Sequence, residues 1–425
     1  MLFNKMTLMQ RKILSLKFKT ADTDELRIIA ALNTMKIFQT IPEIKCESKN
    51  SKISIALRIE GNRIFISTQS VKELLKVWEL YSKSIAKAPN GSEELCLAYA
   101  NRSALLIKLC KYIECIEDIN RALELNYQSH LKIKLLFRKI KCLHLSNDIV
   151  KLKDTIEEAK FCLRNINLSC NKKKYEEQLM KVEYFNTKSF SKINVITRVP
   201  SYVSHKNIPS ASKILTIKFS EKFGRHLVTT CKVDAGEILI MERPYANILM
   251  PEAIYTHCSH CLQVYWALIP CEFCIYAMYC SYKCKNEAWK QYHDIECLVT
   301  GYLLNIDFNK CKLFSMRLTI LALRQAGSIE KLKHIVQNAN NYTDPSRKGF
   351  DEDGMYCSDK YCSFYSLTTN TEKRSVSDLF DRALDAANIL YYLCVYTTLF
   401  GKKFDQDINK KIHKFMIAMV ATMLL

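Results

Sequence analysis

The sequence predicts an α+β chain that is mostly helical, and three observations lead to this prediction. Apolar residues recur at helical spacing over residues 58–164, where an internal repeat is also visible. Residues 211–257 are instead short runs rich in β-branched side chains, separated by turn residues. Cysteines crowd into residues 258–297, and helical patterns return over 298–425. We therefore expect a helical array, a small β segment, a metal-binding insert and a second helical part.

Length and composition limit the class of protein. The 425 residues are 48% hydrophobic and contain only 9 Gly and 8 Pro, which favours two or three folded domains and excludes collagen-like or low-complexity chains. The longest apolar run, Phe415–Leu425, is shorter than the roughly 18 residues that a membrane span needs. The basic N-terminus lacks the apolar segment of a secretory signal. We expect a soluble protein of the cytoplasm and nucleus, with no membrane partner.

Charge and cysteine content point to possible ligands. The chain has 63 Lys and Arg against 43 Asp and Glu, a net charge of +20. This excess favours acidic partners such as nucleic acid, anionic lipid or acidic peptide tails, or it forms a solvated lysine-rich surface. Of the 19 cysteines, seven fall between Cys258 and Cys297. Because the cytoplasm keeps thiols reduced, such a cluster predicts metal ligands rather than disulfides. The pair Cys357 and Cys362 is predicted to be buried thiols.

The internal repeat predicts stacked helix pairs. Tyr81, Ser84 and Pro89 in segment 78–89 have the same offsets as Ile119, Ala122 and Tyr127 in segment 115–127, 38 residues later, and a third copy centres on Ala159, 37 residues after Ala122. The pattern resembles the tetratricopeptide repeat, a helix-turn-helix unit of about 34 residues, and the alternative is an ordinary helical bundle. Residues 1–57 are predicted to be partly helical and partly irregular. Residues 165–210, rich in Lys, Asn and Ser, are predicted to be a linker.

The repeat resemblance implies a groove for acidic peptides. Tetratricopeptide domains that bind chaperones hold the ligand with basic residues and asparagines on successive first helices. The matching positions here are Arg58, Asn62, Asn101, Lys134 and Arg138. Pairs spaced i, i+4 share one helix face, and a guanidinium or ammonium group binds carboxylates well. The hypothesis is that this groove binds the Glu-Glu-Val-Asp tails of heat-shock chaperones, and the alternative is a solvated basic face.

The β segment is predicted from three runs. They are KILTIKFS at 213–220, GRHLVTTCKV at 224–233 and EILIMERPY at 237–245, with turn residues between them. β-Branched side chains favour strands because they pack well on a pleated surface. We expect each run to form a strand.

The cysteine cluster predicts two zinc sites. Two residues between cysteines allow a tight turn to aim both sulfurs at one ion, and three residues between ligands place them on one helical turn, so CSYKC and HDIEC are predicted to be helix-borne pairs. Eight thiolate and imidazole donors suit two tetrahedral Zn²⁺ ions, with no position left for a catalytic water. The predicted ligands are Cys258, Cys261, Cys271, Cys274, Cys280, Cys284, His293 and Cys297.

This spacing, with the segment AMYCSYKCKNEAWKQYHDIEC, resembles the MYND zinc finger. The resemblance implies interleaved ligands. Cys258, Cys261, Cys280 and Cys284 would hold one ion, and Cys271, Cys274, His293 and Cys297 the other. His257 and His260 are predicted to be bystanders. The charges within the finger sum to −1, so it lacks the clustered Lys and Arg of a phosphate-binding surface. It is predicted to bind peptides rather than nucleic acid.

The β segment before the finger resembles the opening of a SET methyltransferase domain. FGRHLVTTCKVDAGEILIMERPYANIL, at 223–249, precedes the finger as in the SET-and-MYND protein-lysine methyltransferases, and the N-terminal repeats are those of one branch of that family. Residues 361–393 are similar to the family's helical insert. The resemblance implies S-adenosylmethionine as cofactor, beside the turn Gly224-Arg225-His226, and a histone or other lysine-bearing protein as substrate. A glycine there lets the backbone approach the cofactor.

The family's second SET half has no counterpart in the sequence. Its Asn-His-Ser-Cys-x-Pro-Asn segment, its Gly-Glu-Glu strand and its three-cysteine zinc site are not found, and no catalytic residue is assigned. The chain ends in the apolar segment 410–425, which we interpret as a truncated helical insert. We expect a chain that is inactive by itself and acts as a zinc-containing scaffold for protein interactions. The alternative is a nucleic-acid-associated transcriptional regulator, which the global charge favours.

Overall fold

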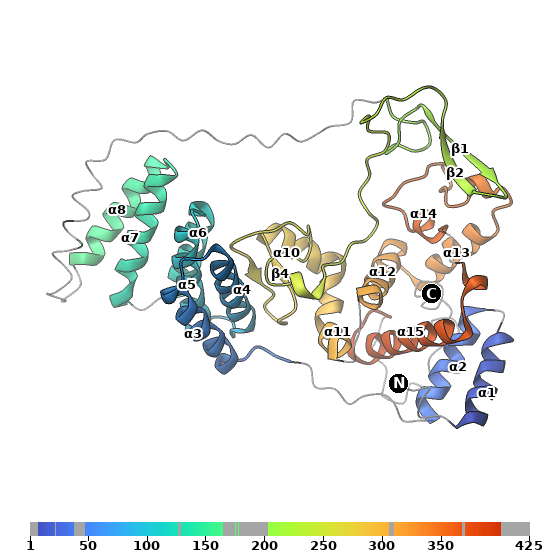
Figure 1. Cartoon of the computed structure of the whole chain (residues 1–425), viewed down its shortest axis with the longest axis horizontal. Coiled ribbons are helices and arrows are strands. Elements are labelled where there is room, and N and C mark those ends of the chain that lie inside the picture. The colour runs from blue at the N-terminus through green and yellow to red at the C-terminus, as the bar shows by residue number, and fades with distance from the viewer. Residues whose placement is uncertain are drawn as a thin grey trace. The chain divides into compact units, whose positions relative to one another are not determined.

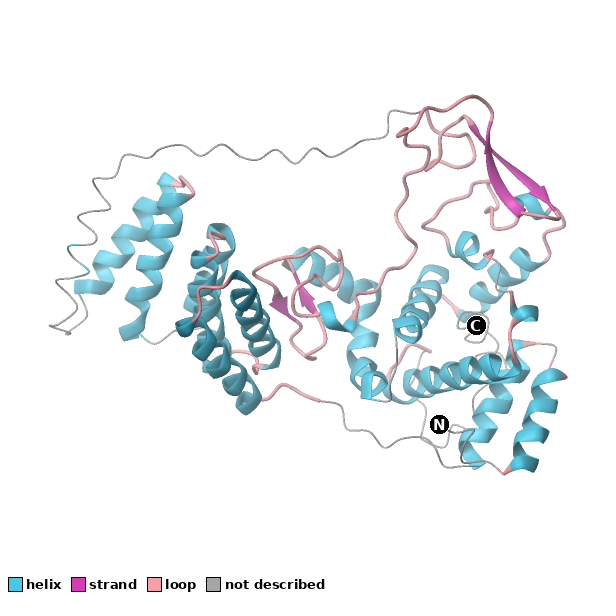
Figure 2. Ribbon diagram, in the orientation of Figure 1, coloured by secondary structure: helices cyan, strands magenta, loops and turns pink. Residues whose placement is uncertain are grey.

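Helices make up most of the structure, as the sequence predicts (Figure 2). The computed structural model describes residues 7–21, 23–37, 47–125, 129–164, 175, 177, 203–305, 310–367 and 370–400. The chain divides into two compact units. One unit contains Glu47–Val195 and Leu249–Ala288, and the other contains Met1–Cys46, Ile196–Ile248 and Trp289–Leu425. Within the described residues, no helix combines the length and apolarity that crossing a membrane requires.

Six consecutive helices form three pairs in the first unit, and we call them the repeat array (Figure 1). Short turns at 68–70, 109–111 and 146–148 join the two helices of each pair. The array begins at Ser51, seven positions before the start predicted from periodicity. The helices are α3 (Ser51–Ser67), α4 (Val71–Lys87), α5 (Glu93–Lys108), α6 (Tyr112–Glu124), α7 (Ser129–Leu145) and α8 (Ile149–Arg164).

The turns of the second and third pairs have the same local structure. Each contains a left-handed residue, Cys110 with φ of 58° and Asn147 with φ of 59°. In each turn the following residue donates its amide to the carbonyl five positions earlier, at 2.9 and 3.1 Å. This pattern is the Schellman ending of a helix, which satisfies carbonyls that would otherwise lack a partner. The two turns are therefore a structural repeat, in line with the sequence repeat.

A glycine allows the first two helices to approach closely. A Cβ atom built on Gly61 of α3 would lie only 2.6 Å from the ring of Tyr81 on α4. The tyrosine is buried, and its hydroxyl donates to Asn62 Oδ1 at 2.8 Å. Burial raises the pKa of Tyr81 well above its ordinary value, so the phenol stays protonated as a donor.

A buried ion pair joins α5 to α6. The Arg102 side chain and the Asp118 carboxylate are both 0% exposed. The guanidinium donates two hydrogen bonds to the carboxylate, at 2.7 and 2.9 Å, and a third to Ser82 Oγ at 3.2 Å. A buried charge is tolerated only when paired and hydrogen-bonded, so this pair fixes how the two helices face each other.

The N-terminal and C-terminal helices pack together in the second unit. Helices α1 (Leu8–Lys19) and α2 (Asp24–Ile37) contact α15 (Val376–Tyr396), where the rings of Phe18 and Phe380 lie 5.3 Å apart, edge to face. The other α-helices among the described residues of this unit are α11 (Asp294–Asn305), α12 (Lys310–Ala326), α13 (Ile329–Asn340) and the short α14 (Tyr361–Tyr365). Single 3-10 turns lie at η4 (Pro345–Arg347) and η5 (Thr371–Lys373). Cys357 and Cys362 are half-buried, and Cys362 lies in α14.

Two of the three predicted β runs form strands. β1 (Leu215–Ser220) pairs antiparallel with β2 (Gly224–Thr229) in a two-stranded sheet. The prediction of a strand over 237–245 is wrong, because in this region the structure has only an isolated bridge between Ala211 and Ile240. Two backbone hydrogen bonds, from Ser212 and Met241, hold the segment. A strand needs a ladder of bonds along a neighbouring strand, and β-branched composition alone does not supply one.

Several predicted segments lie outside the described residues. They include most of the linker over 165–210 and the apolar segment 410–425.

Replacing Asp118 with asparagine should lower the free energy of unfolding of the first unit by about 3 kcal/mol, because it leaves the buried Arg102 guanidinium without a counter-charge. Urea unfolding followed by tryptophan fluorescence, to which Trp78 and Trp266 contribute, would measure it. Glu79→Gln is the matched control, since it removes the partly exposed pair with Lys83 and should cost less than about 1 kcal/mol. Equal losses in the two variants would contradict the importance of the buried pair.

Candidate metal centre

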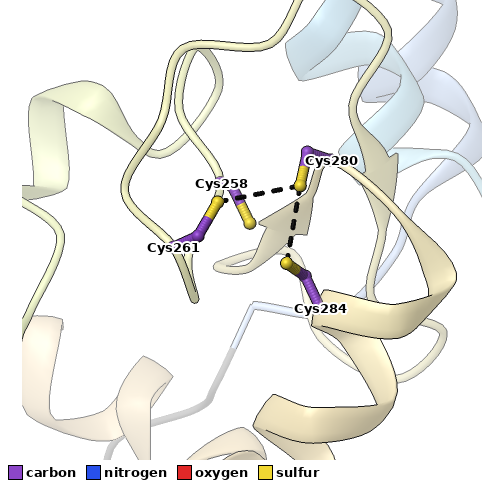
Figure 3. Close-up of side chains that lie close together, drawn as sticks. All are labelled: Cys258, Cys261, Cys280 and Cys284. Atoms are coloured by element: carbon purple, nitrogen blue, oxygen red, sulfur yellow. Dashed lines mark hydrogen bonds between the residues drawn. The ribbon is translucent and has the colours of Figure 1, made fainter. Parts of the chain in front are cut away.

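Four cysteine sulfurs lie together in the first unit (Figure 3). Cys258 and Cys261 follow the 3-10 turn η2 (Pro251–Ala253), Cys280 follows β4 (Met278–Tyr279), and Cys284 lies in α10 (Tyr282–Ala288). The Cys280 sulfur is 3.7 Å from that of Cys261 and 3.5 Å from that of Cys284. All four sulfurs are within 4.8 Å of one another. We call this group the first cluster.

Backbone hydrogen bonds shape the loops that hold this cluster. The Cys258 amide donates to Gln263 O at 2.9 Å, and Leu262, whose φ is 62°, donates to Cys258 O at 3.0 Å. This tight turn places two sulfurs on the same side of the loop. The strand β3 (Ile269–Pro270) pairs antiparallel with β4, and Ser259 donates to Met278 O at 2.7 Å. The short ladder therefore brings the first two cysteines to the second two.

A second cluster consists of Cys271, Cys274, His293 and Cys297. All four side chains are buried, and their donor atoms also lie within 4.8 Å of one another. His293 is the last residue of the π-helix η3 (Trp289–His293), and Cys297 lies one turn further on in α11. The interleaved grouping implied by the family resemblance is thus the grouping in the structure. One detail differs, because Cys280 lies at the end of β4 rather than on a helix.

The donor sets fit tetrahedral zinc. A zinc–sulfur distance of about 2.3 Å places the sulfurs of a tetrahedral site about 3.8 Å apart, close to the 3.7 and 3.5 Å separations in the first cluster. Burial raises the pKa of Cys284 to about 11 and also raises the pKa of Cys280. Coordination to Zn²⁺ displaces the protons of such thiols. With four protein donors at each site, zinc would have a structural role.

The two neighbouring histidines have other partners. His260 Nε2 lies 3.3 Å from a carboxylate oxygen of Glu287. His257 Nδ1 lies 2.8 Å from the hydroxyl of Thr256. Neither histidine belongs to a cluster in the described residues.

An arginine that sequence reasoning missed supports the second cluster. Glu296, next to the ligand Cys297, is buried and receives two hydrogen bonds from Arg317, at 2.7 and 2.6 Å. The same guanidinium lies 3.7 Å from the ring centroid of Tyr292, next to the ligand His293. Such neighbours orient metal ligands. In the sequence, Arg317 is one of four basic residues of α12, and a lone arginine between apolar residues carries no metal signature.

The predicted cofactor turn lies at the start of β2. Gly224 has φ of 62°, and no atom lies within 4 Å of where its Cβ would be. Arg225 donates to the backbone oxygen of Lys348 and to Ser366 Oγ. His226 Nδ1 lies 2.9 Å from Gly224 O. The turn is therefore open on its glycine side.

The predicted peptide-binding residues lie on the first helices of the three pairs. Asn62 on α3 and Asn101 on α5 are joined by a hydrogen bond of 2.7 Å. Arg58 is half-buried on α3, and its Nε is buried without a hydrogen-bond acceptor among the described residues. Lys134 on α7 is exposed.

Arg138 is already engaged within the array. Its guanidinium donates to Ala100 O at 2.9 Å and to Ser103 Oγ at 2.6 Å, which ties α7 to α5. Its charge can still act on a ligand, but part of its hydrogen-bonding capacity is used.

Residues 258–297 match the MYND finger family. The chain is also 30% identical over 292 residues to the protein-lysine N-methyltransferase SMYD4 of Pongo abelii, covering 62% of this chain and 36% of that protein. It is 27% identical to the enzyme of the same name in Danio rerio (84% and 45%) and in Mus musculus (80% and 48%). The chain is therefore similar to SET-and-MYND proteins over most of its length. It spans less than half the length of these curated SET-and-MYND relatives. No solved structure matches it significantly.

The purified chain should contain two zinc ions per molecule, measured by inductively coupled plasma mass spectrometry. His293→Ala removes one donor of the second cluster and should lower the content to about one ion, because three remaining donors bind zinc far more weakly. His260→Ala is the matched control and should leave two ions. A wild-type content below two, or an unchanged content in His293→Ala, would contradict the assignment.

Proposed function

We propose that this SET-and-MYND chain is a zinc-stabilised protein-interaction scaffold whose repeat array binds acidic peptide tails. The observation that carries the proposal is the buried Nε of Arg58, which lacks an acceptor in the described structure and lies four residues before the Asn62–Asn101 pair. A buried donor without a partner costs free energy, which a ligand carboxylate would recover. Groups that bind carboxylates are therefore gathered on the first helices of the pairs.

The proposed groove, formed by Arg58, Asn62, Asn101, Lys134 and Arg138, has three cations and two amides. Exposed Lys134 is placed to attract a terminal or side-chain carboxylate. The amide pair is held by Tyr81, whose hydroxyl donates to Asn62, so the amides are oriented before a ligand arrives. Such preorganisation strengthens binding because less ordering is needed. The proposed ligand is the Glu-Glu-Val-Asp tail of cytosolic heat-shock chaperones.

The catalytic side of the proposal concerns protein-lysine methylation, the activity in the names of the relatives. S-adenosylmethionine would supply the methyl group, with a lysine of a histone or another protein as acceptor. The open turn at Gly224 would let the backbone approach this cofactor, with Arg225 holding the turn against residues 348 and 366. We propose that these groups alone do not methylate a substrate, since methyl transfer needs an oriented, water-free channel.

Further partners follow from the same proposal. The finger would bind peptides, and the chain would act in the cytoplasm and nucleus without direct contact to nucleic acid. The alternative, a nucleic-acid-associated regulator, predicts salt-dependent binding of DNA or RNA by the basic chain.

A Glu-Glu-Val-Asp peptide titrated against the whole chain should bind with micromolar affinity in isothermal calorimetry. Lys134→Ala should weaken this binding about tenfold, because it removes a charge-assisted hydrogen bond. The matched control is Lys132→Ala, on the same helix, where the lysine pairs with Glu158 instead. Equal affinities for the two variants, or binding unaffected by amidation of the peptide's C-terminus, would remove the groove from the proposal.

Calorimetry with S-adenosylmethionine tests the non-catalytic assignment. We expect no saturable micromolar binding to this chain, because the Gly224–His226 turn supplies only part of a cofactor site. Saturable binding that is lost in Gly224→Val would show instead that the chain forms a working cofactor pocket.

A further inference from the structure

A short segment of the finger lies against the repeat array within the first unit. Its three successive backbone carbonyls, at residues 266–268, each accept a hydrogen bond from a side chain of a different helix. The bonds run from Trp78 Nε1 to Trp266 O at 2.9 Å, from Arg121 Nη1 to Ala267 O at 2.7 Å and from Arg102 Nη2 to Leu268 O at 2.7 Å. The array thus binds this segment as it would bind an extended peptide.

Side chains of the segment add to these contacts. The rings of Trp78 and Trp266 lie 4.2 Å apart, and Lys111 Nζ is 5.1 Å from the Trp266 ring centroid. The Tyr265 hydroxyl donates to the Glu117 carboxylate at 2.7 Å. Aromatic stacking and cation–π contacts both favour association of the two surfaces. The contact is therefore a specific interface.

The array has two separate surfaces. The finger is held mainly by the second helices, α4 and α6, with Arg102 reaching through from α5. The proposed groove residues lie on the first helices, α3, α5 and α7. The docked finger therefore leaves the first-helix surface available to a partner.

The docked segment lies between metal ligands, because Cys261 of the first cluster precedes it and Cys271 of the second cluster follows β3. It lies between Cys261 and Cys280, and it leads directly into β3, which pairs with β4 just before Cys280. Small metal-binding domains fold only when their ligands are held by the ion. Without an ordered finger, Leu268 O would no longer accept from the buried Arg102 guanidinium, and a buried donor would lose its partner.

We propose that metal loading of the first cluster stabilises the finger-binding face of the array, formed by Trp78, Arg102, Asp118 and Arg121, and that docking to this face in turn slows metal loss. Linkage is reciprocal, because any free energy that metal loading adds to docking is also added by docking to metal binding. The finger then stabilises the array only while it holds metal. This inference stands whether or not the groove binds acidic tails.

Hydrogen exchange measured by mass spectrometry on the whole chain tests whether metal loading stabilises the array. Cys284→Ser, or zinc chelation, should raise amide exchange in α4–α6 at least tenfold and leave α7 and α8 unchanged. The helices α7 and α8 are the internal reference, since none of the contacts above involves them. Unchanged exchange in α4–α6, or an equal rise in all six helices, would overturn the proposal.

The reverse effect is tested by variants that keep all metal ligands. Trp78→Phe retains an aromatic ring but loses the bond to Trp266 O, and Arg121→Ala loses the bond to Ala267 O. Both should retain two zinc ions and release zinc to a chromogenic chelator several-fold faster than the unmodified chain. Lys151→Ala, which removes an exposed ion pair on α8, is the control and should release zinc at the unmodified rate. Unmodified release rates in both interface variants would overturn the proposal.

Discussion

The first unit depends on one buried cation. Arg102 has 0% exposure, and its guanidinium is surrounded by acceptors from three places: Asp118 on α6, Ser82 on α4 and Leu268 in the finger. A charge in such a position is stable only while these acceptors stay in place. The helix pair, the neighbouring pair and the finger are therefore positioned by the same group. This constraint explains why an inserted zinc domain and a helical array can share one structural core.

The sequence predicted what local chemistry dictates. The metal donors were visible because a tetrahedral ion restricts the spacing of its ligands. The grouping of Cys258 with Cys280, which the structure contains, came instead from the resemblance to the MYND finger. Helices were visible because a buried face repeats every three to four residues.

The remaining features depend on partners far away in the chain. Every residue has a backbone carbonyl, so no residue pattern marks those at 266–268 as hydrogen-bond acceptors for Trp78, Arg102 and Arg121. Arginine is usually a surface residue, so the sequence does not indicate that Arg102 and Arg317 are buried. Their burial depends on tertiary contacts. The run 237–245 has strand composition but no strand beside it. In each case the deciding contact is non-local, which single-sequence patterns do not encode.

The missing side chain at position 61 has a consequence for ligand selection. Because nothing separates the α3 backbone from the Tyr81 ring, the phenol reaches the Asn62 amide, and that amide reaches Asn101 on α5. A side chain at position 61 would push α3 away from the Tyr81 ring of α4 and would move Asn62 with it. The position of the amide pair that the proposed groove presents to a peptide therefore depends on the absence of a side chain at position 61.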